Sequence, residues 1–242
     1  MIYQLYYWPG IQGRGEFVRL ALEEAGAEYL DVAKDSGGEE QAVRKLQALL
    51  NDPKIPRPAF AVPALKAGEL VIAQTANILM YLGAYHGLAP TDEAGRLWAH
   101  QLQLTIADWA VEIHDTHHPL GPTEYYQDQK QEARKRTASF LKRRLPKFMD
   151  YFEKVLKQNP SGDQFLVGST LTYPDLSLFQ IIEGLRYAFP RNQARIEAKH
   201  PKVVALHERV LKRPHIAAYL ASGRRIPFNE EGLFRHYPEL DG

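Results

Sequence analysis

The feature that most constrains the fold of this chain is a change in the spacing of its apolar residues near residue 88. Before this point, short runs of β-branched and aromatic residues alternate with helical segments, and beyond it apolar residues recur only at helical spacing. The runs that predict strands are 2–7, 29–32, 60–65 and 69–73, and those that predict helices are 14–25 and 75–82. This change favours a small α/β domain followed by an all-α domain.

The first part of the chain has the order strand, helix, strand, irregular segment, strand, strand, helix. This order predicts a thioredoxin-like layout, in which helices cover a small sheet. The irregular segment is 34–58, and only a partial helix near 39–50 is expected within it.

The second part is expected to consist of helices. The predicted helices are 93–118, 128–158, 172–187, 193–213 and a short 214–222. Pro146 is expected to kink or divide the second of them. With a boundary in the Pro-containing stretch 89–92, we predict domains at 1–86 and 92–222, followed by an ordered C-terminal extension at 223–242.

Composition removes several function classes. The chain has no cysteine, which excludes disulfides, thiolate metal sites and a cysteine nucleophile, so any thiol chemistry would use a thiol brought by a substrate. The 30 basic and 29 acidic residues nearly cancel, so we expect no nucleic acid partner and no membrane surface. No apolar run could span a bilayer and no signal peptide is evident, so we expect a cytoplasmic protein.

Three local motifs could bind a ligand, although each also has an ordinary structural explanation. Val62-Pro63 falls within a predicted strand, where the proline either sits on an edge or follows a cis bond that turns the Val62 backbone toward an extended peptide ligand. Gln74-Thr75 stands at a strand-to-helix change, where Thr75 either caps its own helix or helps the helix N-terminus hold a carboxylate. Tyr7 is either a core residue or a phenol that donates to a substrate sulfur.

Taken together, the motifs resemble those of the soluble glutathione transferase family, in particular its tyrosine-type classes such as pi, mu and sigma. The matching stretches are Tyr7-Trp8-Pro9 with Gly13-Arg14, Val62-Pro63-Ala64-Leu65, Gln74-Thr75-Ala76-Asn77-Ile78-Leu79 and Thr170-Leu171-Thr172-Tyr173-Pro174-Asp175. The resemblance covers roughly residues 1–220, and the combination of motifs is specific although each motif alone is not. The last stretch also reads as an N-capping box with a structural role.

The resemblance implies roles for residues in the first motifs. Tyr7 matches the catalytic tyrosine and Arg14 the basic residue near it. Val62, which precedes the expected cis-Pro63, would hold the cysteinyl part of glutathione through its backbone. Adjacent Tyr6 is expected on the opposite face of the strand.

The resemblance also implies how the γ-glutamyl end is held. Gln74 and Thr75 match the pair that grips the γ-glutamyl carboxylate. Asp108 matches an acid that reaches the γ-glutamyl amine in the partner subunit of pi-like enzymes, which implies a homodimer. Trp8 matches the mu-class Tyr-Trp pair and is expected near the substrate.

The chain departs from the family pattern in two places. One extra residue lies between Tyr7 and Gly13, and segment 34–58 is longer than its usual counterpart. Because of the longer segment, the basic residue for the glycyl carboxylate is open among nearby cations. We take Lys54, with Arg44 and Lys45 as alternatives.

Two other clusters are interpreted as structural. His114, His117 and His118 lie at helical spacing, but nothing in the sequence fixes a supporting partner and Pro119 follows them. We therefore expect no metal there, but a helix end that borders the electrophile pocket. The basic run 130–144 is interleaved with acidic and apolar residues and is expected to be the solvated face of a helix.

The function implied by the resemblance is glutathione transfer. Glutathione would be the co-substrate, and the Tyr7 hydroxyl would stabilise its thiolate for attack on small hydrophobic electrophiles. Glutathione-dependent peroxide reduction needs no protein cysteine and is also open. The alternative is a non-catalytic binding or structural module that has the same fold, and the intact motif set favours the enzyme.

Overall fold

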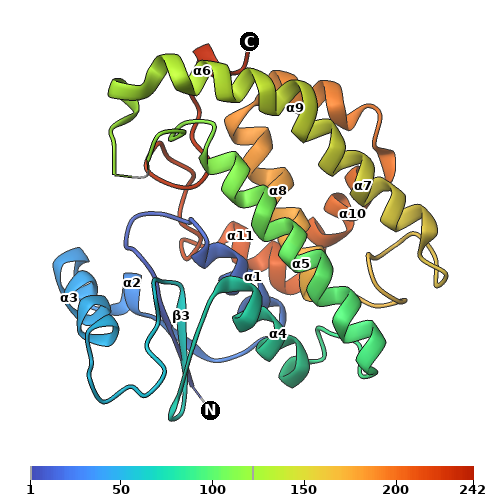
Figure 1. The fold of residues 1–242 in the computed structure, drawn as a ribbon. Helices are drawn as coiled ribbons and strands as arrows, with labels where there is room; N and C mark the ends of the chain where they lie inside the picture. The colour runs from blue at the N-terminus through green and yellow to red at the C-terminus, as the bar shows by residue number, and fades with distance from the viewer. Residues whose placement is uncertain (1, 122) are drawn as a thin grey trace.

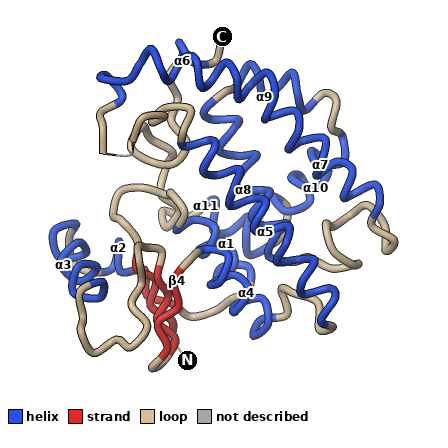
Figure 2. The backbone as a smooth tube through the Cα atoms, viewed as in Figure 1, coloured by secondary structure: helices blue, strands red, loops and turns tan. Residues whose placement is uncertain are grey.

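The computed structural model describes residues 2–121 and 123–242 and shows a four-stranded mixed sheet at the N-terminal end of the chain (Figures 1 and 2). The strands are β1 (Tyr3–Tyr6), β2 (Tyr29–Asp31), β3 (Ala64–Ala67) and β4 (Leu70–Ala73). Their spatial order is β2-β1-β3-β4, with β1 parallel to β2 and antiparallel to β3. Leu5, in the centre of β1, pairs with Asp31 and with Leu65.

The helices of this head are α1 (Gly15–Glu24), α2 (Val32–Asp35), α3 (Glu39–Leu50) and α4 (Thr75–His86). The partial helix expected near 39–50 is α3. The third strand was predicted to begin at Phe60, which is wrong: residues 60–62 form bends, and the strand begins at Ala64. Pro63 lies just before the ladder, where its missing N–H costs no sheet hydrogen bond, and the Val62–Pro63 peptide bond is cis.

After residue 88, all the elements that the structure describes are helical. They are α5 (Glu93–His114), η1 (Tyr126–Gln129), α6 (Lys130–Ser139), η2 (Phe140–Arg144), α7 (Leu145–Gln158), α8 (Tyr173–Ala188), α9 (Pro190–Glu197), α10 (Pro201–Leu211), α11 (Pro214–Ala221) and η3 (Pro238–Leu240). The expected combination of a thioredoxin-like α/β head with an all-α part is confirmed. None of the helices in the described part of the chain has the length and apolarity to cross a membrane.

Several predicted helix boundaries are wrong. The division of the helix expected over 128–158 is confirmed: a π-helical turn, η2, precedes Pro146, which sits in the first turn of α7. Other boundaries differ from the prediction. The helix expected over 193–213 is two helices, since α9 ends before His200 and α10 begins at Pro201. The helix predicted over 93–118 ends at His114, four residues earlier than expected.

The head and the helical part share one apolar core. It runs from Leu5 of β1 and Leu20 of α1 to Trp109 of α5 and Phe179 of α8, all of them fully buried. The expected capping box starts α8, where Thr172 and Asp175 satisfy one another's backbone. Because α1 packs against α8 and α11, the loop before α1 is held at the junction of the two parts.

Candidate functional site

A cavity of about 580 Å³ lies between the loop before β3, the start of α4 and one face of α5. The structure brings five of the predicted site residues to its wall: Arg14, Val62, Pro63, Gln74 and Thr75. They are far apart in sequence, and the antiparallel pairing of β1 with β3 and of β3 with β4 brings their segments together.

Gln74 and Thr75 form the start of α4. Gln74 is the only non-glycine residue with positive φ in the described chain, at φ 69°, a conformation that costs on the order of 1–3 kcal/mol. Of the two alternatives for Thr75, capping of its own helix does not apply, because the chain turns at Gln74 and Thr75 is already the first helical residue. The Thr75 hydroxyl is buried and has no hydrogen-bond partner.

Two polar residues of α5 complete this wall and were missed from the sequence. His100 Nδ1 and Gln103 Oε1 are buried without a partner, as is Thr75 Oγ1. A buried polar atom left unpaired costs about 1–3 kcal/mol, so three such atoms around one cavity point to a polar ligand. The only signal in the sequence is their three-residue spacing on α5 among apolar neighbours.

Tyr7 lies just behind this wall. It follows β1, is 6% exposed, and packs in a small cluster with Leu46 of α3 and Val62. Its Oη accepts a hydrogen bond of 2.8 Å from the backbone N–H of Arg14. A Cβ at Gly13 would lie 2.2 Å from this oxygen, so the glycine is required for the ring to approach the start of α1. Tyr6 faces elsewhere and donates its hydroxyl proton to Gln4.

The surroundings of Tyr7 keep its phenol protonated. Burial raises the pKa of Tyr7, while the Arg14 N–H bond and the positive charges of Arg14 and Arg19 act against that rise. With its oxygen already accepting a hydrogen bond, the phenol has its own proton left to donate.

The other predicted site residues do not reach the cavity. Trp8 is 43% exposed in the loop after β1. Lys54 is exposed, and only its backbone N–H is engaged, with Asp52. The alternatives Arg44 and Lys45 are exposed on α3.

Asp108 lies on an exposed face of α5. Leu97, Leu104 and Val111 are all exposed and recur every seven residues, and Asp108 lies on the same face between the last two. Phe60, in the loop at the mouth of the cavity, is 95% exposed. This face of α5 therefore carries three exposed apolar side chains, with Gln101 and Asp108 between them.

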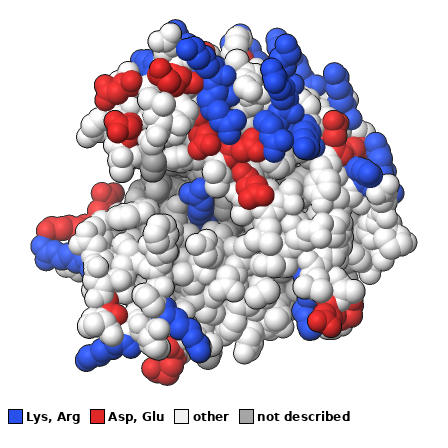
Figure 3. All heavy atoms as spheres, in the orientation of Figure 1, with Lys and Arg blue, Asp and Glu red and all other residues white. Residues whose placement is uncertain are grey.

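The basic run 130–144 lies along α6 and η2. Figure 3 shows Lys and Arg gathered over α6 and α7, with acidic side chains beside them. Arg144 and Arg136 pair with Glu112 of α5, at 2.6 Å and 3.8 Å. The face is thus of mixed charge. Figure 3 also shows the molecule hollowed where the head meets the helical part.

The C-terminal extension folds back over the loop that follows β1. Gln12 donates to the Ile226 carbonyl at 2.5 Å, and Asn229 donates to the Gly10 carbonyl at 2.8 Å. Leu233 and Phe234 line a small cavity beside Gly13. The extension therefore holds the loop that carries the start of α1.

Comparisons with known proteins agree with this architecture. The family model for the glutathione S-transferase N-terminal domain matches residues 3–84, and that for the C-terminal domain matches residues 114–223. The chain is 26% identical over 222 residues to a glutathione S-transferase of Plasmodium falciparum, covering 90% of this chain and 94% of the relative. It is 28% identical over 218 residues to glutathione S-transferase P 10 of Caenorhabditis elegans, covering 90% of each.

A solved structure shows the same fold. The prostaglandin synthase D of Nilaparvata lugens superposes with a TM-score of 0.71 and 22% identity, covering 94% of this chain and all of that one. At this identity the likeness concerns the fold alone.

Proposed function

Because the chain belongs to the glutathione S-transferase family, we propose that it joins glutathione to small hydrophobic electrophiles and that Tyr7 stabilises the glutathione thiolate. The observation that carries this proposal is the contact between Tyr7 Oη and the Arg14 N–H. It fixes the phenol at the N-terminus of α1 with its proton free for a sulfur. The same thiolate would reduce organic peroxides.

Only a modest free energy is required to lower the pKa of the glutathione thiol. A thiol with a pKa near 8.5 is only a few per cent ionised at neutral pH, and the thiolate is the nucleophile. Lowering that pKa by about two units corresponds to about 2.7 kcal/mol of preferential stabilisation of the anion. A hydroxyl donor, the Arg14 charge and the N-terminus of α1 together are of the right size to supply it.

The cavity suits the rest of the tripeptide. The unpaired Thr75 hydroxyl and the free N–H groups at the start of α4 would take the γ-glutamyl carboxylate, with Gln74 held at positive φ beside them. The backbone of Val62, next to Pro63, would pair with the cysteinyl part. Lys54 would reach the glycyl carboxylate only if the loop before β3 closed toward the cavity, and Trp8 would border the substrate.

Tyr7→Phe tests the chemical role. We expect turnover of a chromogenic aryl halide to fall about 10-fold or more, with the pKa of bound glutathione, followed by thiolate absorbance, raised. Tyr6→Phe is the matched control, since its hydroxyl contacts Gln4, and should retain the wild-type rate. An unchanged rate in Tyr7→Phe would contradict the role. Glutathione-affinity retention without turnover by the wild type would favour a non-catalytic module.

We also propose that the protein is a cytoplasmic homodimer in which a second copy covers the exposed face of α5. That face carries three apolar side chains at seven-residue spacing, which is typical of a helix packed against a partner. Pairing through it would turn Asp108 toward the glutathione amine of the other subunit. Cell fractionation tests the compartment.

Leu104→Glu tests the dimer. We expect the molar mass in light scattering to fall from two chains to one, whereas Leu120→Glu, an equally polar change at another exposed leucine, should leave it at two. Asp108→Asn should keep the dimer but weaken glutathione binding about 10-fold, the loss of one charge-assisted hydrogen bond. A monomeric wild type, or unchanged binding by Asp108→Asn, would contradict this arrangement.

A further inference from the structure

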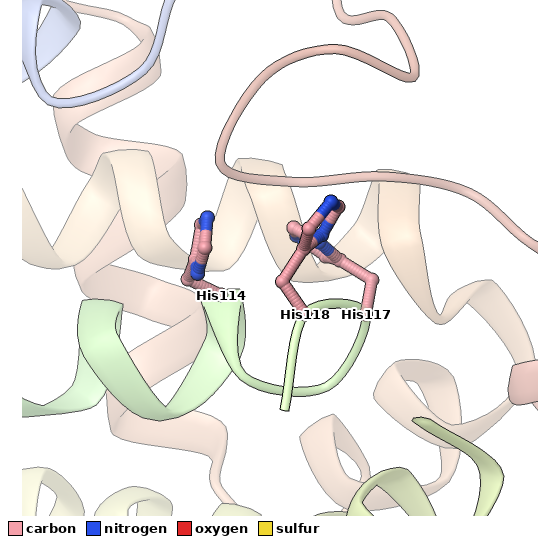
Figure 4. A group of neighbouring side chains, drawn as sticks. All are labelled: His114, His117 and His118. Carbon is pink, nitrogen blue, oxygen red and sulfur yellow. The ribbon is translucent and has the colours of Figure 1, made fainter. Parts of the chain in front are cut away.

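Three histidines meet at the end of α5, one turn beyond Ala110 and Val111, which line the cavity described above. His114 is the last residue of the helix, and His117 and His118 stand on the turn that follows. Their ring centroids are 4.7–5.3 Å apart, and one nitrogen from each ring lies within 4.8 Å of the others. Figure 4 shows His117 and His118 side by side, with His114 beside them.

The backbone holds this turn in place without any ligand. The N–H groups of His117 and His118 both donate to the His114 carbonyl, at 3.2 and 3.1 Å. Thr137 of α6 donates its hydroxyl proton to the Thr116 carbonyl at 2.8 Å. The three rings therefore project from a fixed frame, and binding an ion would need only side-chain rotations.

The C-terminal extension supplies the partner that the sequence did not reveal. His117 Nε2 lies 3.0 Å from the Leu233 carbonyl oxygen, which can only accept, so Nε2 carries the proton and Nδ1 presents its lone pair. That Nδ1 faces Nδ1 of His118, with which it forms a hydrogen bond. A ring N–H donated to a backbone carbonyl is the support that metal-binding histidines commonly have.

The three imidazoles lie in a buried and positively charged part of the fold. Burial lowers the pKa of His114 to about 4 and that of His117 to about 2, and it lowers the pKa of His118 as well. The charges of Arg14 and Arg235 reach the cluster. They reduce its affinity for a cation and favour an anion as a further ligand.

We propose that His114, His117 and His118 form a three-nitrogen site for a divalent transition-metal ion of the Zn²⁺ type. Imidazole nitrogens suit Zn²⁺ and its neighbours, whereas Mg²⁺ and Ca²⁺ prefer oxygen ligands. Three protein ligands leave a fourth position for water or an anion. The bound ion would also fix Leu233, and with it the extension, against the end of α5.

Cobalt binding tests the site on the full, untagged chain after treatment with a chelator. We expect one Co²⁺ per chain in equilibrium dialysis, with the intense visible d–d bands of a four- or five-coordinate ion, and loss of those bands when Zn²⁺ is added. His118→Asn and, separately, His114→Asn should weaken binding about 100-fold or more, because loss of an outer partner alone costs 10–100-fold.

His215→Asn is the matched control, since His215 is exposed on α11 and its Nδ1 contacts the Glu24 carbonyl at the end of α1 rather than the cluster. It should bind Co²⁺ as the wild type does. Uptake of less than one equivalent by the wild type would overturn the proposal. So would equal affinities in His118→Asn, His114→Asn and His215→Asn.

Discussion

Two helices of the same head, α1 and α3, are packed in opposite ways. Each of the 10 residues of α1 is buried, charged ones included. Of the 12 residues of α3, only Ala42 and Leu46 are buried. Figure 1 shows the reason, because α1 lies between the sheet and the helical part, whereas α3 lies at the outer edge of the head.

The difference matters most for charge. Arg19 of α1 donates to Asp31 at 2.7 Å and lies 3.4 Å from Glu16; Arg19 and Glu16 are fully buried and Asp31 is 5% exposed. Glu16 also accepts from Tyr219 of α11 at 3.0 Å and lies 3.4 Å from Arg225 of the extension. A buried group of this kind fixes the position of α1 relative to its surroundings, since any shift would leave a charge unpaired.

Tyr7 stands between these two regions. Its hydroxyl rests on the N-terminus of α1 and its ring packs on Leu46 of α3. The hydroxyl oxygen of Tyr7 is thus positioned by the fully buried helix α1, while α3 packs against the Tyr7 ring.

The largest expected difference between α1 and α3 is the effect on stability of removing a charge from each helix. Arg19→Met leaves Glu16 and Asp31 buried with less compensation, and we expect the free energy of unfolding to fall by about 3–5 kcal/mol. Arg44→Met removes the cation of an exposed pair with Glu40 on α3 and should change it by less than about 0.5 kcal/mol. Urea denaturation measures both. Similar losses in the two variants would show that α1 and α3 are not held differently.

The sequence alone could predict the helix that the comparison depends on but not its environment. The apolar spacing of Phe17, Val18, Ala21 and Leu22 identifies α1 and its inward face. The spacing does not reveal the partners of Glu16 and Arg19. Those partners are Asp31, Tyr219 and Arg225, which lie on other segments. Glu16 and Tyr219 are 203 residues apart in sequence. The spacing of apolar residues along one segment cannot predict such a contact, and the burial of the charge depends on it.

The candidate site likewise contains residues that the sequence predicts and residues that it does not. Arg14, Val62, Pro63, Gln74 and Thr75 are found from motifs, since each motif is local and its strand pairing follows from the fold. His100 and Gln103 have no motif, and only the packing of α5 on α4 brings them to the cavity. The position of Lys54 outside the cavity was not predictable either, because the loop that carries it follows no regular spacing.

The same reasoning explains the histidine cluster. Spacing along the chain shows that His114, His117 and His118 are near one another, and this much was predictable. The partner of His117 comes from Leu233, 116 positions later, on a segment with no regular structure.

The buried charges of α1 are also expected to have a smaller effect, on the pH dependence of stability. Burial raises the pKa of Glu16 above its usual value of 4.5, against the opposing effects of Arg19, Arg225 and the Tyr219 hydroxyl. Between 4.5 and the raised pKa, the folded chain holds a proton at this site that the unfolded chain has lost. The free energy of unfolding therefore falls as pH rises through this range, with a slope of at most about 1.4 kcal/mol per pH unit for one proton.

Glu16→Gln removes this titrating carboxyl group from both the folded and the unfolded chain. We expect the stability of the wild type relative to the variant to be greatest below pH 4.5 and to decline as pH rises from there through the raised pKa. Urea denaturation of both proteins over this range gives the difference at each pH, and Glu40→Gln on α3 provides the baseline for the slope. A difference that stays constant or grows with pH would mean that the Glu16 carboxylate is better stabilised by Arg19 and Arg225 than its burial implies. In that case the buried charges of α1 would form a strongly favourable ion pair, and α1 would be held chiefly by attraction rather than by its surrounding packing.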